Sequence, residues 1–178
     1  ELSALNAQLQ IDRVLPPAIY DWLRKLPEQV VPMTMLRTAI SLLALHEQGV
    51  EDITIPATLR KAIRLTAQFP MICAAFQRIR EGKQPIDPSP SLGHAANILY
   101  MLNGKAPDPD FTRAMNAYLV MLIDHSMNNS TFTARTVAST QADLHSCVTA
   151  ALASLKGPLH GGANEATMKM LLEIGDES

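Results

Sequence analysis

The stretch TIPATLRKAIRLTAQFPMICAAFQRIRE, residues 54–81, decides the fold class, because it carries a helical apolar period over its whole length. Apolar side chains recur there at spacings of three and four residues, as one face of an α-helix requires. Pro70 is expected to kink or divide this helix, and Gly82 to end it. The positions predicted to face the core are Leu59, Ile63, Thr66, Phe69, Cys73, Phe76 and Ile79.

The same period extends outward in both directions, and no segment alternates with the period of two that is typical of strands. Aromatic residues make up only 4% of the chain. The sequence therefore predicts an all-α protein. The expected helices cover residues 1–10, 16–26, 33–48, 92–102, 110–123, 130–141, 144–155 and 161–174, with Ser91 as the candidate N-cap of the helix that starts at 92.

Length and composition narrow the class of protein further. The 178 residues suffice for one well-buried domain, and 47% hydrophobic against 18% charged residues argues against disorder. A formal net charge of −2 offers no basic excess for nucleic acid or an anionic membrane. No apolar run reaches the roughly 18 residues of a membrane span, and no signal peptide is expected. Two distant cysteines, Cys73 and Cys147, fit a reducing cytoplasm rather than a disulfide framework or a cysteine-based zinc site.

Two of the five histidines lie where the helical pattern breaks. His46, His94 and His145 fall inside helical patterns, where surface or core roles are ordinary. His125 and His160 fall among small and amide residues, close to helix ends with unpaired backbone N–H groups. The positive end of a helix dipole favours a neutral imidazole, which can donate a hydrogen bond to a carbonyl without being charged.

These two histidines leave three interpretations open. His125 and His160 could build one ligand site, with their rings within about 10 Å of each other at one cavity, where Gly161 and Gly162 let a ligand approach the backbone. They could instead have ordinary capping and turn roles. A metal site from Asp124, His125 and His160 is the third, although no HExxH or cysteine-rich spacing supports it. The nearby hydroxyls, Ser130, Thr131 and Thr133, are expected to cap a helix.

Three segments together resemble one enzyme family. LIDHSMNNSTFTARTVAST at 122–140 and LKGPLHGGANEATMKML at 155–171 are similar to the two histidine segments of the citrate synthase family, which includes 2-methylcitrate synthase. VPMTMLRTAISLL at 31–43 resembles the family's helix after a His-Pro-Met start, with Val31 in place of the histidine. The resemblance implies an all-α, multi-helical array with a large domain, a small domain and a homodimer built from helix pairs.

The resemblance also implies an activity and residue roles. The family condenses acetyl-CoA or propionyl-CoA with oxaloacetate and hydrolyses the thioester to give citrate or 2-methylcitrate and CoA. His160 would be catalytic, stabilising the enol of the thioester. His125 and Asn129 would bind oxaloacetate, and Gly161, Gly162 and Asn164 would support the loop. Acetyl-CoA is then a cosubstrate, no metal or covalently bound cofactor is expected, and neither nucleic acid nor membrane is an expected partner.

The resemblance further implies that residues 1–178 are a partial large domain, truncated at both ends and inactive alone. The family's general base, an aspartate, and its carboxylate-binding arginines belong to segments that this sequence does not contain, as does the small domain. Two alternatives stay open. One is a non-catalytic helical dimerisation or scaffold module, and the other is a regulatory relative that keeps the fold without turnover.

Overall fold

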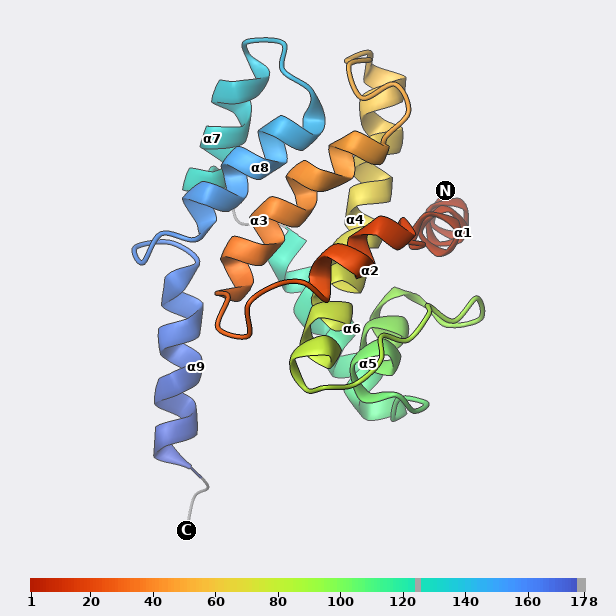
Figure 1. Ribbon diagram of the computed structural model, residues 1–178, viewed down its shortest axis with the longest axis vertical. Coiled ribbons are helices and arrows are strands. Elements are labelled where there is room, and N and C mark those ends of the chain that lie inside the picture. Colours follow the sequence, from red (N-terminus) through yellow and green to blue (C-terminus); the bar gives the residue numbers. More distant parts are fainter. Residues whose placement is uncertain (124–125, 176–178) are drawn as a thin grey trace.

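The structure, a computed structural model, describes residues 1–123 and 126–175, with the backbone alone at residues 163–165. Over this part of the chain every regular element is helical and no strand occurs, so the all-α prediction is confirmed (Figure 1). The elements are α1 (Leu2–Asp12), α2 (Pro17–Leu23), α3 (Pro32–Leu43), the 3₁₀ turn η1 (Ala44–His46), α4 (Ile55–Arg80), α5 (His94–Asn103), α6 (Pro109–Ile123), α7 (Asn129–Ala138), α8 (Leu144–Leu155) and α9 (Gly162–Ile174).

Helix α4 organises the fold, because α1, α2, α3, α5 and α8 all contact it. It runs unbroken through Pro70, so the prediction that this residue would divide it is wrong. Proline in a helix interior costs about 3 kcal/mol. The residues that follow it, Met71 and Ile72, are completely buried, and packing on several sides offsets that cost.

The predicted inner face of α4 is right only in part, since Phe76 is buried and Phe69 and Ile79 pack against the core. Leu59 and Cys73 are exposed, whereas Lys61 and Gln68 are buried with Leu65 and other residues of the opposite register. A hydrophobicity pattern places lysine and glutamine outside, but here each long side chain carries its polar end to backbone carbonyls that would otherwise lack partners. Which side chains of α4 are buried therefore depends on the donors that backbone carbonyls need as well as on apolar character.

Lys61 shows this demand directly. Its Nζ donates hydrogen bonds to the carbonyl oxygens of Gly49, Val50 and Asp52 at 3.2, 2.7 and 2.6 Å. These carbonyls belong to the turn after η1, and the ammonium has three donors, one for each of them. A side chain that is only 3% exposed thus ties the loop 49–52 to α4.

The core is formed mainly by α2, α3, α4 and α5, to which α8 adds Leu152. Its fully buried side chains include Ile19, Met35, Ile40, Ile72 and Met101. Ser91 does not cap α5, contrary to the prediction, because the helix begins at His94 with Gly93 at the N-cap position. Helix α5 ends at Gly104, whose φ of 74° is the left-handed conformation that glycine adopts readily.

An open apolar cleft of about 830 Å³ lies between α4, α5, α6 and α8. The inner side of α6 lines it through Met115, Tyr118 and Leu119, and Cys73 lies on the opposite wall. Cys73 is exposed toward this cleft, yet the protein atoms around its thiol raise its pKa to about 11. Within the described residues, no helix has both the length and the apolar character needed to cross a membrane.

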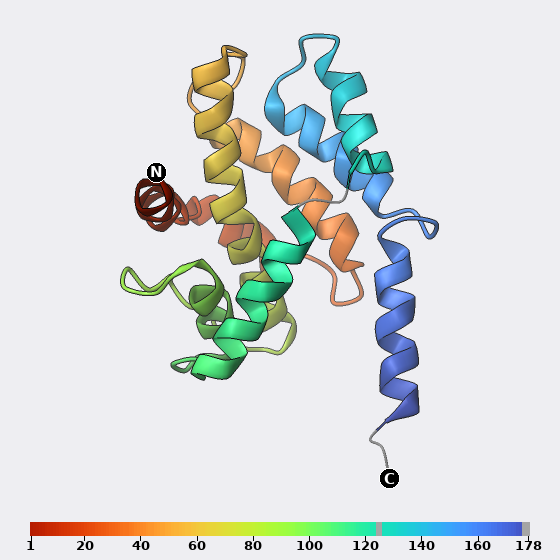
Figure 2. The same cartoon turned by 180° about the vertical axis from the view of Figure 1, so that it is seen from behind.

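The C-terminal part of the fold consists of the helix pair α7–α8 and the separate helix α9. Helices α7 and α8 pack against each other and α8 packs on α3. Helix α9 then leaves the end of α8 and extends away from the other helices in both views (Figures 1 and 2). Exposed apolar side chains cover it, namely Met168, Met170, Leu171, Leu172 and Ile174. The turn between α8 and α9 carries His160.

Candidate functional site

The turn at residues 156–161 is held by the backbone at the end of α8. The N–H of Gly161 donates to the carbonyl oxygen of Leu155 at 2.9 Å, and the N–H of His160 donates to that of Gly157 at 3.0 Å. These bonds satisfy carbonyls that a helix end leaves without partners. Leu159, which is 97% exposed, lies at the tip of the turn. The turn is therefore held by hydrogen bonds of the chain itself and needs no ligand to form.

Position 161 requires glycine because a side chain would not fit there, and not because of its backbone torsion angles. Its φ of −65° suits any residue, but a Cβ at this position would lie 2.4 Å from the carbonyl oxygen of Leu155. Gly162 is less tightly enclosed, since its Cβ would lie 3.2 Å from the carbonyl oxygen of Gly157. Both distances concern atoms of the turn itself, so Gly161 allows close approach of protein backbone whether or not a ligand binds.

His160 points from this turn to the start of α7. Its Nε2 lies 3.0 Å from the Oγ of Ser130, 30 residues earlier in the chain. The imidazole is half-buried there. Ser130 is the second residue of α7, and His160 comes two residues before α9 begins. The ring therefore lies close to the N-terminal, electropositive ends of two helices, a setting suited to developing negative charge.

Asn128 fixes the position of Ser130, the hydrogen-bond partner of His160. It is the N-cap of α7, and its Oδ1 accepts from the backbone N–H of Thr131 at 2.7 Å and from the hydroxyl of Ser130 at 2.8 Å. Ser126 precedes it in the left-handed region with a φ of 57°. The segment before α7 therefore sets the Ser130 hydroxyl by a capping arrangement that the Asn-x-Ser order makes possible.

The hydroxyl of Ser130 has one hydrogen and two neighbours. Asn128 Oδ1 can only accept, so a hydroxyl that donates to it must accept from His160, whose Nε2 then carries the hydrogen. If Ser130 donates to His160 instead, a neutral imidazole carries its hydrogen on Nδ1 and can donate it elsewhere. The direction of one O–H bond thus sets which nitrogen of His160 is a donor.

The structure tests only some of the sequence predictions for this site. His125 and Asp124 lie outside the described residues, as does the side chain of Asn164, so the shared cavity and the metal alternative stay untested. Asn129 is exposed, and its predicted substrate role stays a prediction. The contact that holds the loop belongs to its neighbour Asn128, which the sequence predictions did not assign. Helix α7 begins at Asn129, and an asparagine directly before a helical pattern was the signal that could have indicated Asn128 as its N-cap.

The remaining histidines lie elsewhere. His46 is exposed at the end of η1, and His94 opens α5. His145 is 2% exposed near the start of α8, 3.8 Å from the carboxylate of Asp143. Burial lowers the pKa of both His94 and His145. Among the residues that the structure describes, His, Cys, Asp and Glu form no group of three able to hold a metal ion.

A family comparison decides the relationship of this chain to known proteins. The family model for the C-terminal domain of citrate synthase matches residues 1–178. The chain belongs to the citrate synthase family. Citrate synthase 2 of Bacillus subtilis is 48% identical over 177 residues, which cover 99% of this chain and 48% of that protein. The citrate/2-methylcitrate synthase of the same organism is 42% identical over 173 residues, covering 97% and 46%.

Solved structures of the family agree with the fold. The citrate synthase of Thermoplasma acidophilum, in a ternary complex with carboxymethyl coenzyme A and oxaloacetate, gives a TM-score of 0.90 at 29% identity. The match covers 99% of this chain and 46% of that one. The chain thus spans about half the length of the citrate synthases that it matches.

Proposed function

We propose that this chain is part of an enzyme of the citrate synthase type. The reaction joins the methyl carbon of acetyl-CoA or propionyl-CoA to the keto carbon of oxaloacetate and then hydrolyses the thioester. The observation that carries the proposal is the contact of His160 with Ser130 beside two helix starts. Relatives named for both citrate and 2-methylcitrate synthesis support either acyl-CoA as the substrate.

The role proposed for His160 follows from the chemistry of a thioester. Removing a methyl proton needs a base and stabilisation of the negative charge that develops on the carbonyl oxygen. A neutral imidazole N–H can supply that stabilisation as a hydrogen-bond donor. Because Nε2 of His160 faces Ser130, Nδ1 is the nitrogen left for the thioester. It donates only when Ser130 turns its hydrogen from Asn128 to His160.

The remaining parts belong to the same proposal. His125 and Asn129 bind oxaloacetate, Gly161, Gly162 and Asn164 support the loop, and an aspartate base with carboxylate-binding arginines comes from the rest of the enzyme. Residues 1–178 form part of the large domain. The exposed apolar side of α9 supports a homodimer, since such a surface needs a partner. The free thiols Cys73 and Cys147 support a cytoplasmic location.

The test is the release of free CoA thiol by the intact enzyme with oxaloacetate and either acetyl-CoA or propionyl-CoA. Turnover with one or both is expected, and the ratio of the two kcat/KM values gives the substrate preference. His160→Ala should lower kcat by orders of magnitude with the far-UV circular dichroism unchanged, whereas the exposed His46→Ala should leave kcat unchanged. Absence of turnover with both substrates would favour the scaffold or regulatory alternative, and a normal kcat for His160→Ala would refute the catalytic role.

A further inference from the structure

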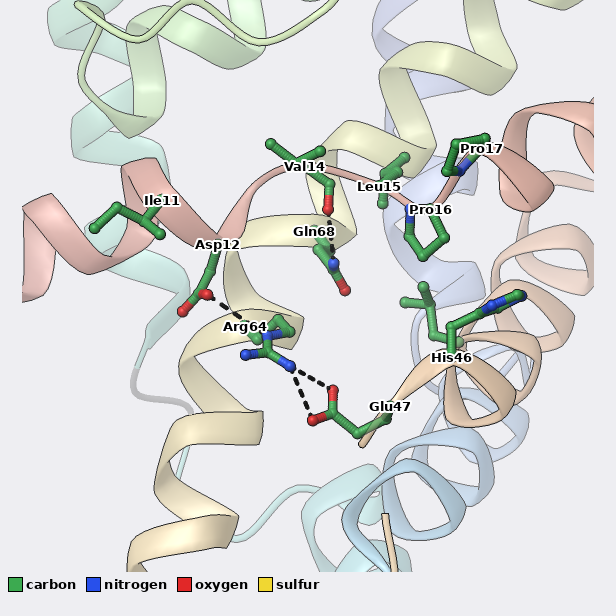
Figure 3. A pocket seen from close by; sticks show the side chains of 11 residues that line it. Ile11, Asp12, Val14, Leu15, Pro16, Pro17, His46, Glu47, Arg64 and Gln68 are labelled. Atoms are coloured by element: carbon green, nitrogen blue, oxygen red, sulfur yellow. Dashed lines mark hydrogen bonds and ion pairs between the residues drawn. The ribbon is translucent and has the colours of Figure 1, made fainter. Parts of the chain in front are cut away.

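A polar pocket lies far along the chain from His160, where the end of α1, the turn to α2, η1 and α4 meet. Its volume is about 400 Å³. Figure 3 shows Asp12 and Glu47 on either side of Arg64, with Pro16 and Pro17 along one wall. The proposed reaction uses none of these residues.

One guanidinium serves two carboxylates in this pocket. Arg64 Nη1 lies 2.9 and 3.0 Å from the two carboxylate oxygens of Glu47, and Arg64 Nε lies 3.5 Å from Asp12 Oδ1. The carboxylate side chains are only 8% and 10% exposed, whereas Arg64 is 39% exposed. Lys61 lies one turn earlier, but its ammonium is bound by the carbonyls of the loop 49–52 and does not line the pocket. Asp12, Glu47 and Arg64 together leave one negative charge in excess, and His46 is the other titratable side chain of the lining.

Gln68 adds a hydrogen-bond acceptor, its Oε1, to which no described residue donates. Its Nε2 donates to the carbonyl oxygen of Val14 at 2.9 Å, which fixes the amide and turns Oε1 the other way. Figure 3 shows this oxygen pointing away from Val14 into the pocket. The residue is only 7% exposed, but Oε1 is not a buried atom that lacks a partner, so it stands open to the pocket as an available acceptor. The pocket thus presents acceptors and negative charge to whatever enters it.

Apart from His46, the rest of the lining is apolar. Leu15, Pro16, Pro17 and Leu43 form walls that favour a short hydrocarbon segment. We infer that this pocket binds a primary ammonium or guanidinium group carried on a short aliphatic stem. The cationic head donates to Gln68 Oε1 and to the carboxylates, and the stem packs on the prolines and leucines. The head belongs either to a free alkylamine or to a lysine or arginine side chain from the rest of the polypeptide.

The direct test is a calorimetric titration of the protein with n-butylammonium chloride. Saturable binding is expected, about tenfold or more tighter than that of 1-butanol, because only the ammonium makes charge-assisted hydrogen bonds. Butyrate, which has a similar stem and the opposite charge, should not bind. Equal affinity for butylammonium and 1-butanol would overturn the inference.

Variants locate the binding. Glu47→Gln keeps the shape of the side chain and removes its charge, so it should weaken butylammonium about tenfold. The matched control Glu51→Gln makes the same charge change at an exposed residue outside the pocket and should leave affinity unchanged. Asp12→Asn provides a second variant if Glu47→Gln does not fold, as judged by circular dichroism. Unchanged affinity in a folded Glu47→Gln or Asp12→Asn protein would refute the site.

The source of the cation is settled by repeating the titration on the intact enzyme. If a lysine or arginine of the longer polypeptide fills the pocket, only the 178-residue chain binds butylammonium. If the natural ligand is a free amine, both proteins bind it, and both lose binding on Glu47→Gln. Neither result depends on turnover, so failure of this site and failure of the proposed reaction are separate outcomes.

Discussion

His160 Nε2 and Ser130 Oγ lie 3.0 Å apart, and this contact joins the turn before α9 to the first turn of α7. Thirty residues separate the two side chains in sequence. The pair brings together the two segments that the sequence predicted as a histidine site. It also gives a partner to one nitrogen of an imidazole whose other nitrogen is proposed to meet the substrate.

The first prediction concerns Ser130. Ser130→Ala removes the group that faces His160 Nε2, so kcat in the intact enzyme should fall about tenfold to hundredfold while KM for oxaloacetate changes little. Ser130→Thr retains the hydroxyl and should recover most of the loss. The thiol-release assay measures both. Equal kcat values for the Ala and Thr variants would contradict a positioning role for the hydroxyl.

The second prediction separates two adjacent asparagines. Asn128→Ala removes the N-cap of α7 and should lower the free energy of unfolding by about 1 kcal/mol. Asn129→Ala changes an exposed side chain and should stay within about 0.5 kcal/mol of the parent. Urea denaturation of both variants gives the comparison. A larger loss for Asn129→Ala would mean that the cap is assigned to the wrong residue.

The third prediction tests the space at Gly161. A Cβ there would lie 2.4 Å from the Leu155 carbonyl oxygen, so Gly161→Ala should destabilise the protein by about 2 kcal/mol or more. Gly93→Ala is the matched control, because that glycine has a φ of −63° and open space within 4 Å of the point where a Cβ would lie. Thermal melts should show a clear loss for the first and a smaller one, below about 1 kcal/mol, for the second, because alanine is a poorer N-cap of α5 than glycine.

The fourth prediction concerns the lysine inside the fold. Lys61→Met preserves much of the side-chain length but leaves the carbonyls of the loop 49–52 without their donor. The expected loss of stability is roughly 2–3 kcal/mol, the cost of unsatisfied buried acceptors. Lys25→Met, at an exposed position, should cost far less. Similar chemical denaturation midpoints for the two variants would show that the buried ammonium is dispensable.

The fifth prediction is a pH dependence. Burial lowers the pKa of His145 below its ordinary value of 6.5, although the carboxylates of Glu47 and Asp143 act in the opposite direction. The unfolded chain then binds the proton more readily, so the stabilising contribution is complete above pH 6.5 and declines as the pH falls through the lowered folded pKa. His145→Gln should reduce the loss of stability measured between about pH 7 and pH 5. His46→Gln, at an exposed position, should leave that loss unchanged.

Sequence periodicity predicted the helices because most of them have one apolar side, and α8 begins and ends where it was expected, at Leu144 and Leu155. It failed for part of α4, where Leu59, Thr66 and Cys73 are exposed. Hydrophobicity favoured Leu59 over Lys61, but the loop 49–52 needed a donor, and only tertiary structure brings that loop to the helix. A one-dimensional pattern contains no information about which carbonyls remain unpaired.

The candidate site was partly predictable for a similar reason. His160 was found because its Gly-Gly neighbours break the helical pattern. Its pairing with Ser130 could not be found, since the contact depends on how α7 and α8 cross. The choice between Asn128 and Asn129 depends on which residue has extended backbone before the helix, and two identical neighbours give the same local sequence preference.

The crowding at Gly161 has a consequence for evolution. Any side chain at that position meets the Leu155 carbonyl oxygen before a substrate is present, so selection there acts first on folding. A mutant gene with alanine at 161 would be lost even from an organism that did not need the reaction, provided that it needed the protein folded. If glycine never varied at this position among relatives, that constancy would therefore reflect the geometry of the turn. Only a constant His160 beside it would reflect the chemistry.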